Sequence, residues 1–417
     1  MATIFTPNRP EELSEILRWA VANATPLAVV GSGSKSGIGR PMPTEHVLSL
    51  AGFSGVGRYE PNELVLTAGA GTPLAEIEAL LARNGQMLAF EPPDHTHLFA
   101  ASATAPIAGA ARAGTLGGVL AANSSGPRRF LAGAARDHFL GFRAVNGRGE
   151  AFKAGGRVVK NVTGFDLPKL LAGSWGTLAA LWEVTVKVMP VPEFSGALLI
   201  FGLDDTGASR LMRAAAASAH VVSGAAHLPA RVAARSAAVK AAGQSVTALR
   251  VEGPELSVRH RVAGLKALLI GGGQLEGADC DELDSAAALA LWRDIGDLAL
   301  LAAGDTREIW RLSLPPATAP AVVAHIVNGE PAVEWLQDQA GGTLWLSCPA
   351  GTPAEQIRGA LAPDGGHATL WRASAARRSE VPVFQPQPPA LAALTRRVKA
   401  SFDPQAVLNP GRMYSDS

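Results

Sequence analysis

The amino-acid sequence predicts an α+β fold with at least two domains. Its 417 residues exceed a typical domain by roughly two- to threefold. Helical and strand patterns alternate over residues 1–192, and Pro190 and Pro192 mark the expected end of this domain. A different rhythm of strands and helices fills residues 193–375, and residues 376–417 form a C-terminal segment. We therefore expect two folded domains and a separate tail.

The first domain begins with an amphipathic helix after Pro10, because Leu13, Leu17 and Ala20 recur at helical spacing. A strand at residues 27–30 follows, and another is expected at Glu63–Ala68. Thr72 and Pro73 then begin a second helix that runs through Leu81, since proline in the first helical turn loses no hydrogen bond. This order of elements indicates an α/β unit.

The second domain contains a pattern that occurs twice. The expected elements are strand 195–203, helix 205–218, strand 245–252, helix 254–269 and a helical stretch at 281–303, then strand 307–314, a helix from Thr318, strand 343–348, a helix from Pro353 and strand 368–372. Each half resembles a split βαββαβ unit. The doubled unit predicts an antiparallel sheet covered by helices.

Composition and charge exclude several classes of function. Asp, Glu, Lys and Arg make up 18% of the chain, against about 25% in an average soluble protein. The net charge is +1, and no segment concentrates basic residues with aromatic ones, so neither nucleic acid nor an anionic membrane surface is indicated. The low charge suits a subunit that buries surface against partners.

Targeting and cysteine patterns favour a cytoplasmic protein. Residues 1–10 lack a basic start followed by an apolar run, and the apolar stretch 286–304 is interrupted by charged residues. Cys280 and Cys348 lie far apart and outside any CxxC motif. The sequence therefore predicts no disulfide framework, zinc site or cysteine-ligated iron–sulfur cluster.

The segment GTLGGVLAANSSGPRR, residues 114–129, is the most informative stretch of the chain. Gly117 and Gly118 allow a ligand to approach the backbone, and short side chains such as Thr115 and Asn123 can hydrogen-bond it. A bound cofactor and a glycine-rich turn explain this segment about equally well. Under the first interpretation, a leucine at position 117 would occupy ligand space and expel the cofactor.

A second glycine-rich segment, GSGSKSG at residues 31–37, follows the strand at 27–30. Successive small residues can turn their amides toward a phosphate, and Lys35 can add charge. A Rossmann fingerprint fails because Ser36 stands where the third glycine is needed and prolines follow, and a Walker A loop fails because no Gly-Lys-Ser/Thr is present. The loop would hold a phosphate with its amides, without a helix dipole.

The order of these two segments, of KNVTGFDLPKLLAGSWGTLAALWEVTVKV at 160–188 and of FDPQAVLNPGRMY at 402–414 resembles the vanillyl-alcohol oxidase, or PCMH-type, flavoproteins. Within that group, the chain is similar to the FAD-binding E subunits of bacterial glycolate oxidase. The resemblance covers residues 1–192 and the tail well, and the region between them loosely. It implies a two-subdomain FAD-binding domain, a ferredoxin-like cap, and a C-terminal segment that packs back on the FAD domain.

The resemblance also implies which residues bind FAD. The pyrophosphate loop would comprise Gly31, Ser32, Gly33, Ser34, Lys35 and Ser36, with Pro93 and Asp94 along the dinucleotide. The isoalloxazine and ribityl side would be lined by Thr115, Gly117, Gly118, Asn123, Ser125 and Gly126. Gly164, Asp166 and Val184 would hold the adenosine end, and Asn409 would approach the flavin from the tail. Asp166 as a helix cap and Asn409 as a turn residue are the structural alternatives.

The catalytic groups remain unidentified at this stage. Residues 1–40 contain no histidine that could attach the flavin, so noncovalent FAD is expected. No histidine-rich metal motif is present: His367 stands alone, and His95 and His97 lack further ligands nearby. Arg128, Arg129 and Arg136 could neutralise a phosphate or a carboxylate, or lie on an exposed face. No metal site and no catalytic base is predicted.

The resemblance implies a function as the FAD-binding subunit of a glycolate oxidase complex, which oxidises glycolate to glyoxylate and passes electrons from flavin to a partner. A second flavoprotein subunit and an iron–sulfur subunit are the implied partners, and the latter would link the complex to the membrane. Two alternatives stay open. One is a self-sufficient FAD-dependent 2-hydroxy-acid dehydrogenase of the D-lactate type, and the other is a non-catalytic scaffold.

Overall fold

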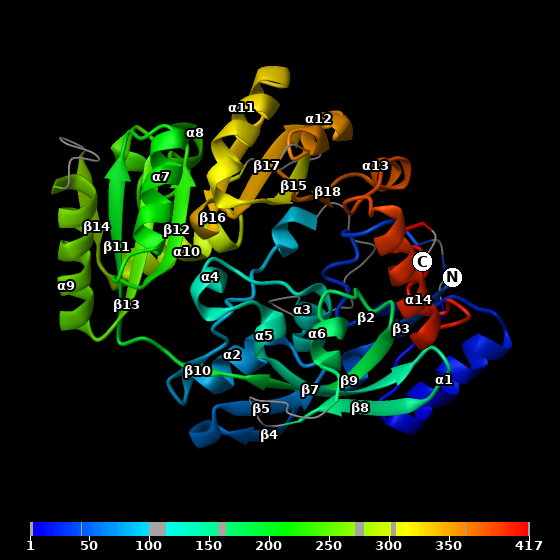
Figure 1. Cartoon of the computed structure of the whole chain (residues 1–417). Coiled ribbons are helices and arrows are strands. Elements are labelled where there is room, and N and C mark those ends of the chain that lie inside the picture. The colour runs from blue at the N-terminus through cyan, green and yellow to red at the C-terminus, as the bar shows by residue number, and fades with distance from the viewer. Residues whose placement is uncertain are drawn as a thin grey trace. The chain divides into compact units, whose positions relative to one another are not determined.

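The computed structural model describes residues 3–42, 44–99, 114–156, 164–271, 279–301, 306–362 and 364–415. The chain forms two compact units (Figure 1). The first comprises Met1–Ser125, Gly133–Val191 and Arg378–Ser417, and the second comprises Gly126–Ala132 and Pro192–Arg377. The chain therefore leaves the first unit briefly at residues 126–132, which the sequence placed in the N-terminal domain.

The first unit contains a small lobe around a parallel sheet. Its strands are β1 (Thr3–Phe5), β3 (His46–Ser49) and β2 (Ala28–Val30), in that spatial order. Helix α1 (Pro10–Ala22) covers them with Leu13, Leu17 and Ala20, all fully buried. The amphipathic spacing thus predicted this helix and its buried face correctly.

The second lobe of the same unit is built on an antiparallel sheet. The described residues form the order β4 (Val56–Glu60), β5 (Val65–Gly69), β9 (Ala179–Lys187), β7 (Phe139–Asn146) and β8 (Ala151–Gly155). Around it lie α2 (Leu74–Ala82), α3 (Leu116–Ala122), α5 (Ala135–His138), α6 (Leu167–Leu171) and the paired short strands β6 (Gln86–Met87) and β10 (Met189–Pro190). The two lobes confirm the expected two-subdomain architecture.

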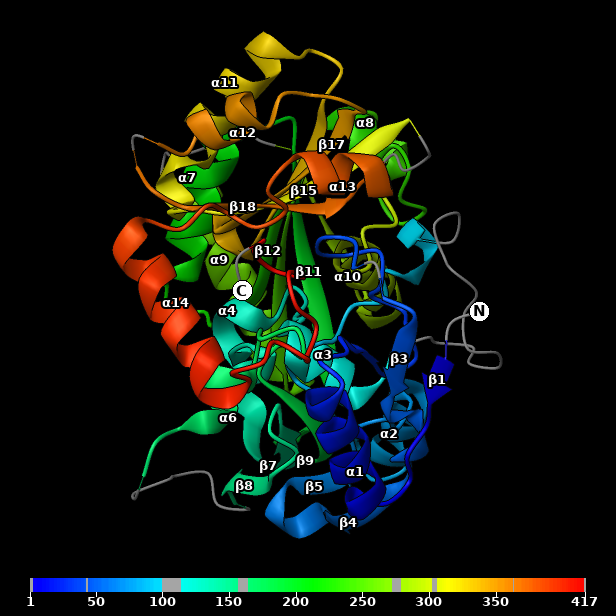
Figure 2. The same cartoon turned by 90° about the vertical axis from the view of Figure 1, so that its right-hand side faces the viewer.

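The C-terminal segment belongs to the first unit, where α14 (Pro389–Phe402) precedes the last residues (Figure 2). Lys399, 6% exposed, donates to the carbonyl oxygens of Thr177 and Leu408 and to the Asp403 carboxylate. Leu408 forms a parallel bridge with Leu27. The tail is thus fixed directly beside β2, at the end of which the 31–36 loop begins.

The second unit carries an antiparallel sheet in which a six-element unit occurs twice. The first copy is β11 (Phe194–Phe201), α7 (Asp205–Ala216), β12 (Val222–Leu228), β13 (Val246–Gly253), α9 (Glu255–Lys266) and β14 (Cys280–Leu283). The second is β15 (Arg307–Ser313), α11 (Ala319–Gly329), β16 (Glu334–Asp338), β17 (Thr343–Pro349), α12 (Ala354–Gly359) and β18 (His367–Arg372). The described strands have the order β14-β11-β13-β12-β16-β17-β15-β18, which confirms the doubled βαββαβ prediction.

Edge strand β14 and the central strands β12 and β16 were not predicted from the sequence. The expected helical stretch at 281–303 instead begins with edge strand β14, and helix α10 spans Ser285–Gly296; residues 302 and 303 lie outside the described residues. Asp284 separates the two elements, because its carboxylate caps the helix by accepting from the Ala287 amide at 2.9 Å. The charged sequence of β14 becomes a strand only through its pairing with β11.

Candidate functional site

A pocket of about 670 Å³, counting its open mouth, lies in the first unit. Its lining comes from β2 and the loop after it, from α3 and from the segment at Trp175 and Gly176, and it includes all six predicted loop residues, 31–36. Thr115, Gly117 and Gly118 line it too. Two glycine-rich segments that are about 80 residues apart in the sequence therefore meet at one pocket of ligand-binding size.

The 31–36 loop favours glycine at two positions, for two different reasons. A Cβ at Gly31 would collide with the Thr115 side chain, whereas Gly33 has φ +80°, a conformation that favours glycine. The Ser36 amide donates to the Gly33 carbonyl at 3.0 Å and closes a turn. This geometry keeps the main chain at the pocket wall, where a phosphate can approach it.

Two cations are among the described residues that line this pocket, Lys35 and Arg412. Burial lowers the pKa of Lys35 to about 8, with Asp94 opposing the shift and Arg412 adding to it. Arg412 is 7% exposed, and burial together with the nearby Arg378 cation lowers its pKa to about 10. No carboxylate is among the described residues that line the pocket. The site is therefore electropositive and suits an anion.

Gly117 is required for a different reason than the one predicted. A Cβ at this position would lie 2.7 Å from the Ala70 Cβ and 2.8 Å from the Ala70 carbonyl oxygen. It would therefore collide with the residue that follows β5, and not with a bound ligand. A Cβ at Gly118, by contrast, would lie 3.0 Å from the Thr115 Oγ1, which accepts a hydrogen bond from the Gly118 amide. A larger residue at position 117 would thus disturb the packing against Ala70 before it could displace a cofactor.

Asn409 fixes the pocket wall and does not line it. It is fully buried, accepts from the Val29 amide at 2.7 Å and donates to the Trp175 carbonyl at 2.7 Å. Trp175 has φ +55° and lines the pocket, with the Arg412 guanidinium 5.6 Å from its ring centroid. The tail residue that was predicted to approach the flavin therefore holds two pocket residues in place.

Other predicted residues lie away from the lining. Asn123 caps α3 with φ +47° and accepts from the Arg136 amide, and Ser125 accepts from the Ala135 amide. Asp94 accepts from the Thr96 amide and acts electrostatically on Lys35, and Pro93 precedes it in the same loop. Gly126 belongs to the second unit. These side chains shape the surrounding loops.

The three residues expected at the adenosine end are likewise spread apart. Gly164 is exposed with φ +86°, and Asp166 is exposed and pairs with Lys169 at 3.1 Å. Asp166 precedes α6 but makes no capping hydrogen bond with its side chain. Val184 is fully buried in the core around β9. Residues 160–163, which open the same sequence segment, lie outside the described residues.

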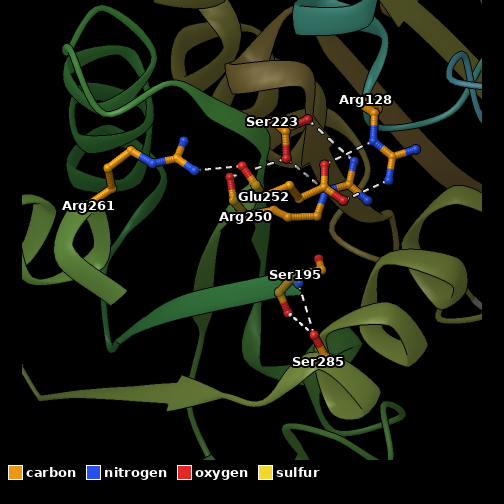
Figure 3. Close-up of polar contacts among 7 residues, drawn as sticks. All are labelled: Arg128, Ser195, Ser223, Arg250, Glu252, Arg261 and Ser285. Atoms are coloured by element: carbon orange, nitrogen blue, oxygen red, sulfur yellow. Dashed lines mark hydrogen bonds and ion pairs between the residues drawn. The ribbon is translucent and has the colours of Figure 1, made fainter. Parts of the chain in front are cut away.

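Arg128 has neither of the roles considered from the sequence. Its guanidinium donates to Glu252 at 2.9 and 2.7 Å inside the second unit, where both side chains are less than a tenth exposed (Figure 3). Arg250, fully buried, lies 3.6 Å from the same carboxylate and 4.8 Å from the Trp292 ring centroid. Arg136 is half-exposed beside Asp137. Arg128 is thus a buried structural cation.

Among the described residues, no group of three or more His, Cys, Asp or Glu residues is arranged to hold a metal ion. His367 is exposed at the start of β18, His97 is exposed, and His95 is buried. No helix in the described part of the chain is long and apolar enough to cross a bilayer.

The fold and pocket define an FAD-binding protein of the PCMH type. Residues 1–155 match the family of FAD binding domains. The structure is similar to that of p-cresol methylhydroxylase, with a TM-score of 0.72 and 13% identity over 99% of this chain and 88% of that one. The chain is 32% identical to glycolate oxidase subunit GlcE of Escherichia coli K12 over 97% of both chains. It belongs to the GlcE family of glycolate oxidase subunits.

A more distant relative matches about half of the chain. Glycolate oxidase subunit GlcD of Bacillus subtilis is 30% identical over 196 residues, which is 47% of this chain and 38% of that one. The similarity thus corresponds in extent to the FAD-binding part of the chain.

The residues present fit FAD. The small residues of the 31–36 loop, the two lining cations and the absence of a lining carboxylate among the described residues match a dianionic pyrophosphate. The apolar wall formed by residues such as Leu50, Leu181 and Trp175 suits an aromatic ring system. The sequence missed Trp175 and Arg412, although Arg412 stands three residues after Asn409 in the quoted tail motif.

Proposed function

We propose that this chain is the FAD-binding subunit of a glycolate oxidase complex. It takes part in the oxidation of glycolate to glyoxylate, which removes two electrons and two protons from the substrate, and electrons pass through flavin to a partner. The end-to-end similarity to GlcE is the observation that carries this proposal. The pocket in the first unit supports it, because it combines a phosphate cradle with an apolar wall.

The predicted FAD ligands keep their roles in this proposal where the pocket brings them together. The 31–36 loop holds the pyrophosphate through its amides, and Lys35 adds charge. Thr115, Gly118 and Trp175 line the remaining wall. FAD, when bound, supplies a two-electron acceptor. We propose noncovalent attachment, because residues 1–40 contain no histidine that could attach the flavin.

The partners proposed are a second flavoprotein subunit and an iron–sulfur subunit. The name of the GlcE relative as a subunit supports an assembly, and so does the low share of charged residues in this chain. The described residues nominate no metal site and no catalytic base of their own, so we assign the better substrate site to the flavoprotein partner. Localisation is cytoplasmic, with membrane association through the partners.

The test is the visible absorption spectrum of the purified full-length chain, before and after anaerobic addition of glycolate, alone and with the co-expressed partner subunits. A flavin spectrum that bleaches only with the partners is the expected result. Bleaching without partners would replace the proposal with a self-sufficient 2-hydroxy-acid dehydrogenase. A colourless chain that takes up no added FAD would leave the scaffold alternative. A K35M variant serves as a control with weakened cofactor binding.

A further inference from the structure

Arg412 is a buried cation of the pocket that was not predicted from the sequence. It comes from the C-terminal tail, is 7% exposed and lines the pocket. Its Nη2 donates to the carbonyl oxygens of Lys35 and Ile38, at 2.9 and 3.5 Å. Its Nε is buried without a hydrogen-bond partner among the described residues. An unpaired donor of this kind is costly unless a ligand satisfies it.

The surrounding backbone is shaped to hold this side chain. Gly39 has φ +88°, and a Cβ there would lie 3.0 Å from the Arg412 carbonyl oxygen and 3.1 Å from its Cγ. The Arg40 amide donates to the Arg412 carbonyl at 2.9 Å. Asn409, three residues earlier, is tied to Val29 and Trp175. Arg412 is therefore fixed against the cradle loop from both sides.

The charge of this region is unbalanced. Lys35 and Arg412 both line the pocket, and Arg378, 6% exposed, donates to the Gly39 carbonyl at 2.7 Å. Asp94 is the acidic group that acts on Lys35, and no acid is among the causes acting on Arg412. Three cations against one acid in this region favour an anion with two or more negative charges.

We propose that Arg412 binds the pyrophosphate of FAD together with Lys35, so that the C-terminal tail selects the dinucleotide form of the flavin. Arg412 bonds to the backbone of the loop whose small residues suit a phosphate, and a guanidinium fork matches phosphate oxygens better than any other side chain does. Two lining cations also match the two negative charges of a pyrophosphate. This inference rests on the FAD-binding role proposed above.

The test compares FAD with riboflavin, which lacks phosphate. The full-length chain is stripped of flavin and titrated with each ligand by fluorescence quenching, for wild type, R412M, R412K and the control R397M, which alters an exposed arginine of α14. R412M should weaken FAD binding by about 10- to 100-fold and riboflavin binding by less than about twofold. R412K should lose less, and R397M should match wild type.

Several outcomes would overturn the proposal. Unchanged FAD affinity in R412M would remove Arg412 from the site while leaving the proposed function intact. Equal losses for FAD and riboflavin would place Arg412 against the flavin ring. If wild type binds no flavin, both proposals fail. If thermal melts show that R412M does not fold, the proposal is tested with R412K and with the salt dependence of FAD binding to wild type. FAD binding that does not weaken as the salt concentration rises would contradict a contact with the pyrophosphate.

Discussion

Replacing Glu252 with glutamine is expected to destabilise the second unit strongly. Burial alone would raise the pKa of Glu252, but hydrogen bonds from Arg128 and the charges of Arg250 and Arg128 outweigh it and hold the pKa at about 2. Removing the carboxylate leaves two buried guanidinium groups without their counter-charge (Figure 3). Breaking a buried ion pair at one partner is among the most damaging changes to a folded protein.

The magnitude follows from the two pKa values of the carboxyl group. Its ordinary value is 4.5 and its folded value is about 2, a difference that corresponds to about 3 kcal/mol of stability at neutral pH. Because the folded pKa is depressed, this contribution is complete above pH 4.5 and is lost as the pH falls toward 2. E252Q should therefore lose about 3 kcal/mol at pH 7 and progressively less toward pH 3.

The assay is urea unfolding of the full-length chain, followed by tryptophan fluorescence at several pH values. Many of its tryptophans report on the second unit: Trp292, Trp310, Trp335, Trp345 and Trp371. E255Q is the matched control, since Glu255 pairs with Arg259 on an exposed helix face and such pairs contribute less than about 1 kcal/mol. In a double-mutant cycle, R128M and E252Q should be strongly non-additive.

Two results would refute this reasoning. Equal unfolding midpoints for E252Q and E255Q at pH 7 would mean that the buried carboxylate contributes nothing beyond a surface pair. A constant stability difference between wild type and E252Q from pH 7 to pH 3 would mean that the carboxyl group does not titrate as a depressed acid. Full additivity of R128M and E252Q would show that the two side chains are not coupled.

Further predictions concern the first unit. G117A should lower the melting temperature of the flavin-free chain, because its Cβ would meet Ala70, whereas G118A should change it much less; equal effects would contradict the packing argument. N409A should cost about 2 to 4 kcal/mol in unfolding experiments, since the buried Val29 and Trp175 groups lose their partner. N409D should cost at least as much, because its second carboxyl oxygen would face the Trp175 carbonyl oxygen to which the amide donates. FAD affinity measured by titration should fall as the pH rises through about 8, because the Lys35 amine, with its lowered pKa, becomes neutral there. K35M should abolish this pH dependence. An identical pH profile in K35M would exclude Lys35 as its source.

Local patterns in the sequence predicted those elements that local physics determines. The spacing of Leu13, Leu17 and Ala20 predicted α1 and its buried face, since helical periodicity is a property of neighbouring residues. The small residues of the 31–36 loop predicted a phosphate cradle, and the structure places all six at one pocket. The doubled rhythm of the second half predicted a repeated βαββαβ unit for the same reason.

Long-range contacts escaped prediction because no local pattern encodes them. The edge strand β14 is charged and becomes a strand only by pairing with β11. Arg128 resembled a surface or phosphate-binding arginine until the fold brought it to Glu252, more than 100 positions later.

By itself, the sequence determined the class of fold, the repeat in the second unit and the segments that line a cofactor pocket, because glycine content and hydrophobic periodicity constrain the backbone locally. Only the tertiary structure decided which cations face that pocket and what holds its walls. Asn409 reaches β2, and Arg412 reaches the loop after it, across about 380 residues of sequence, and these contacts depend on the folded path of the whole chain.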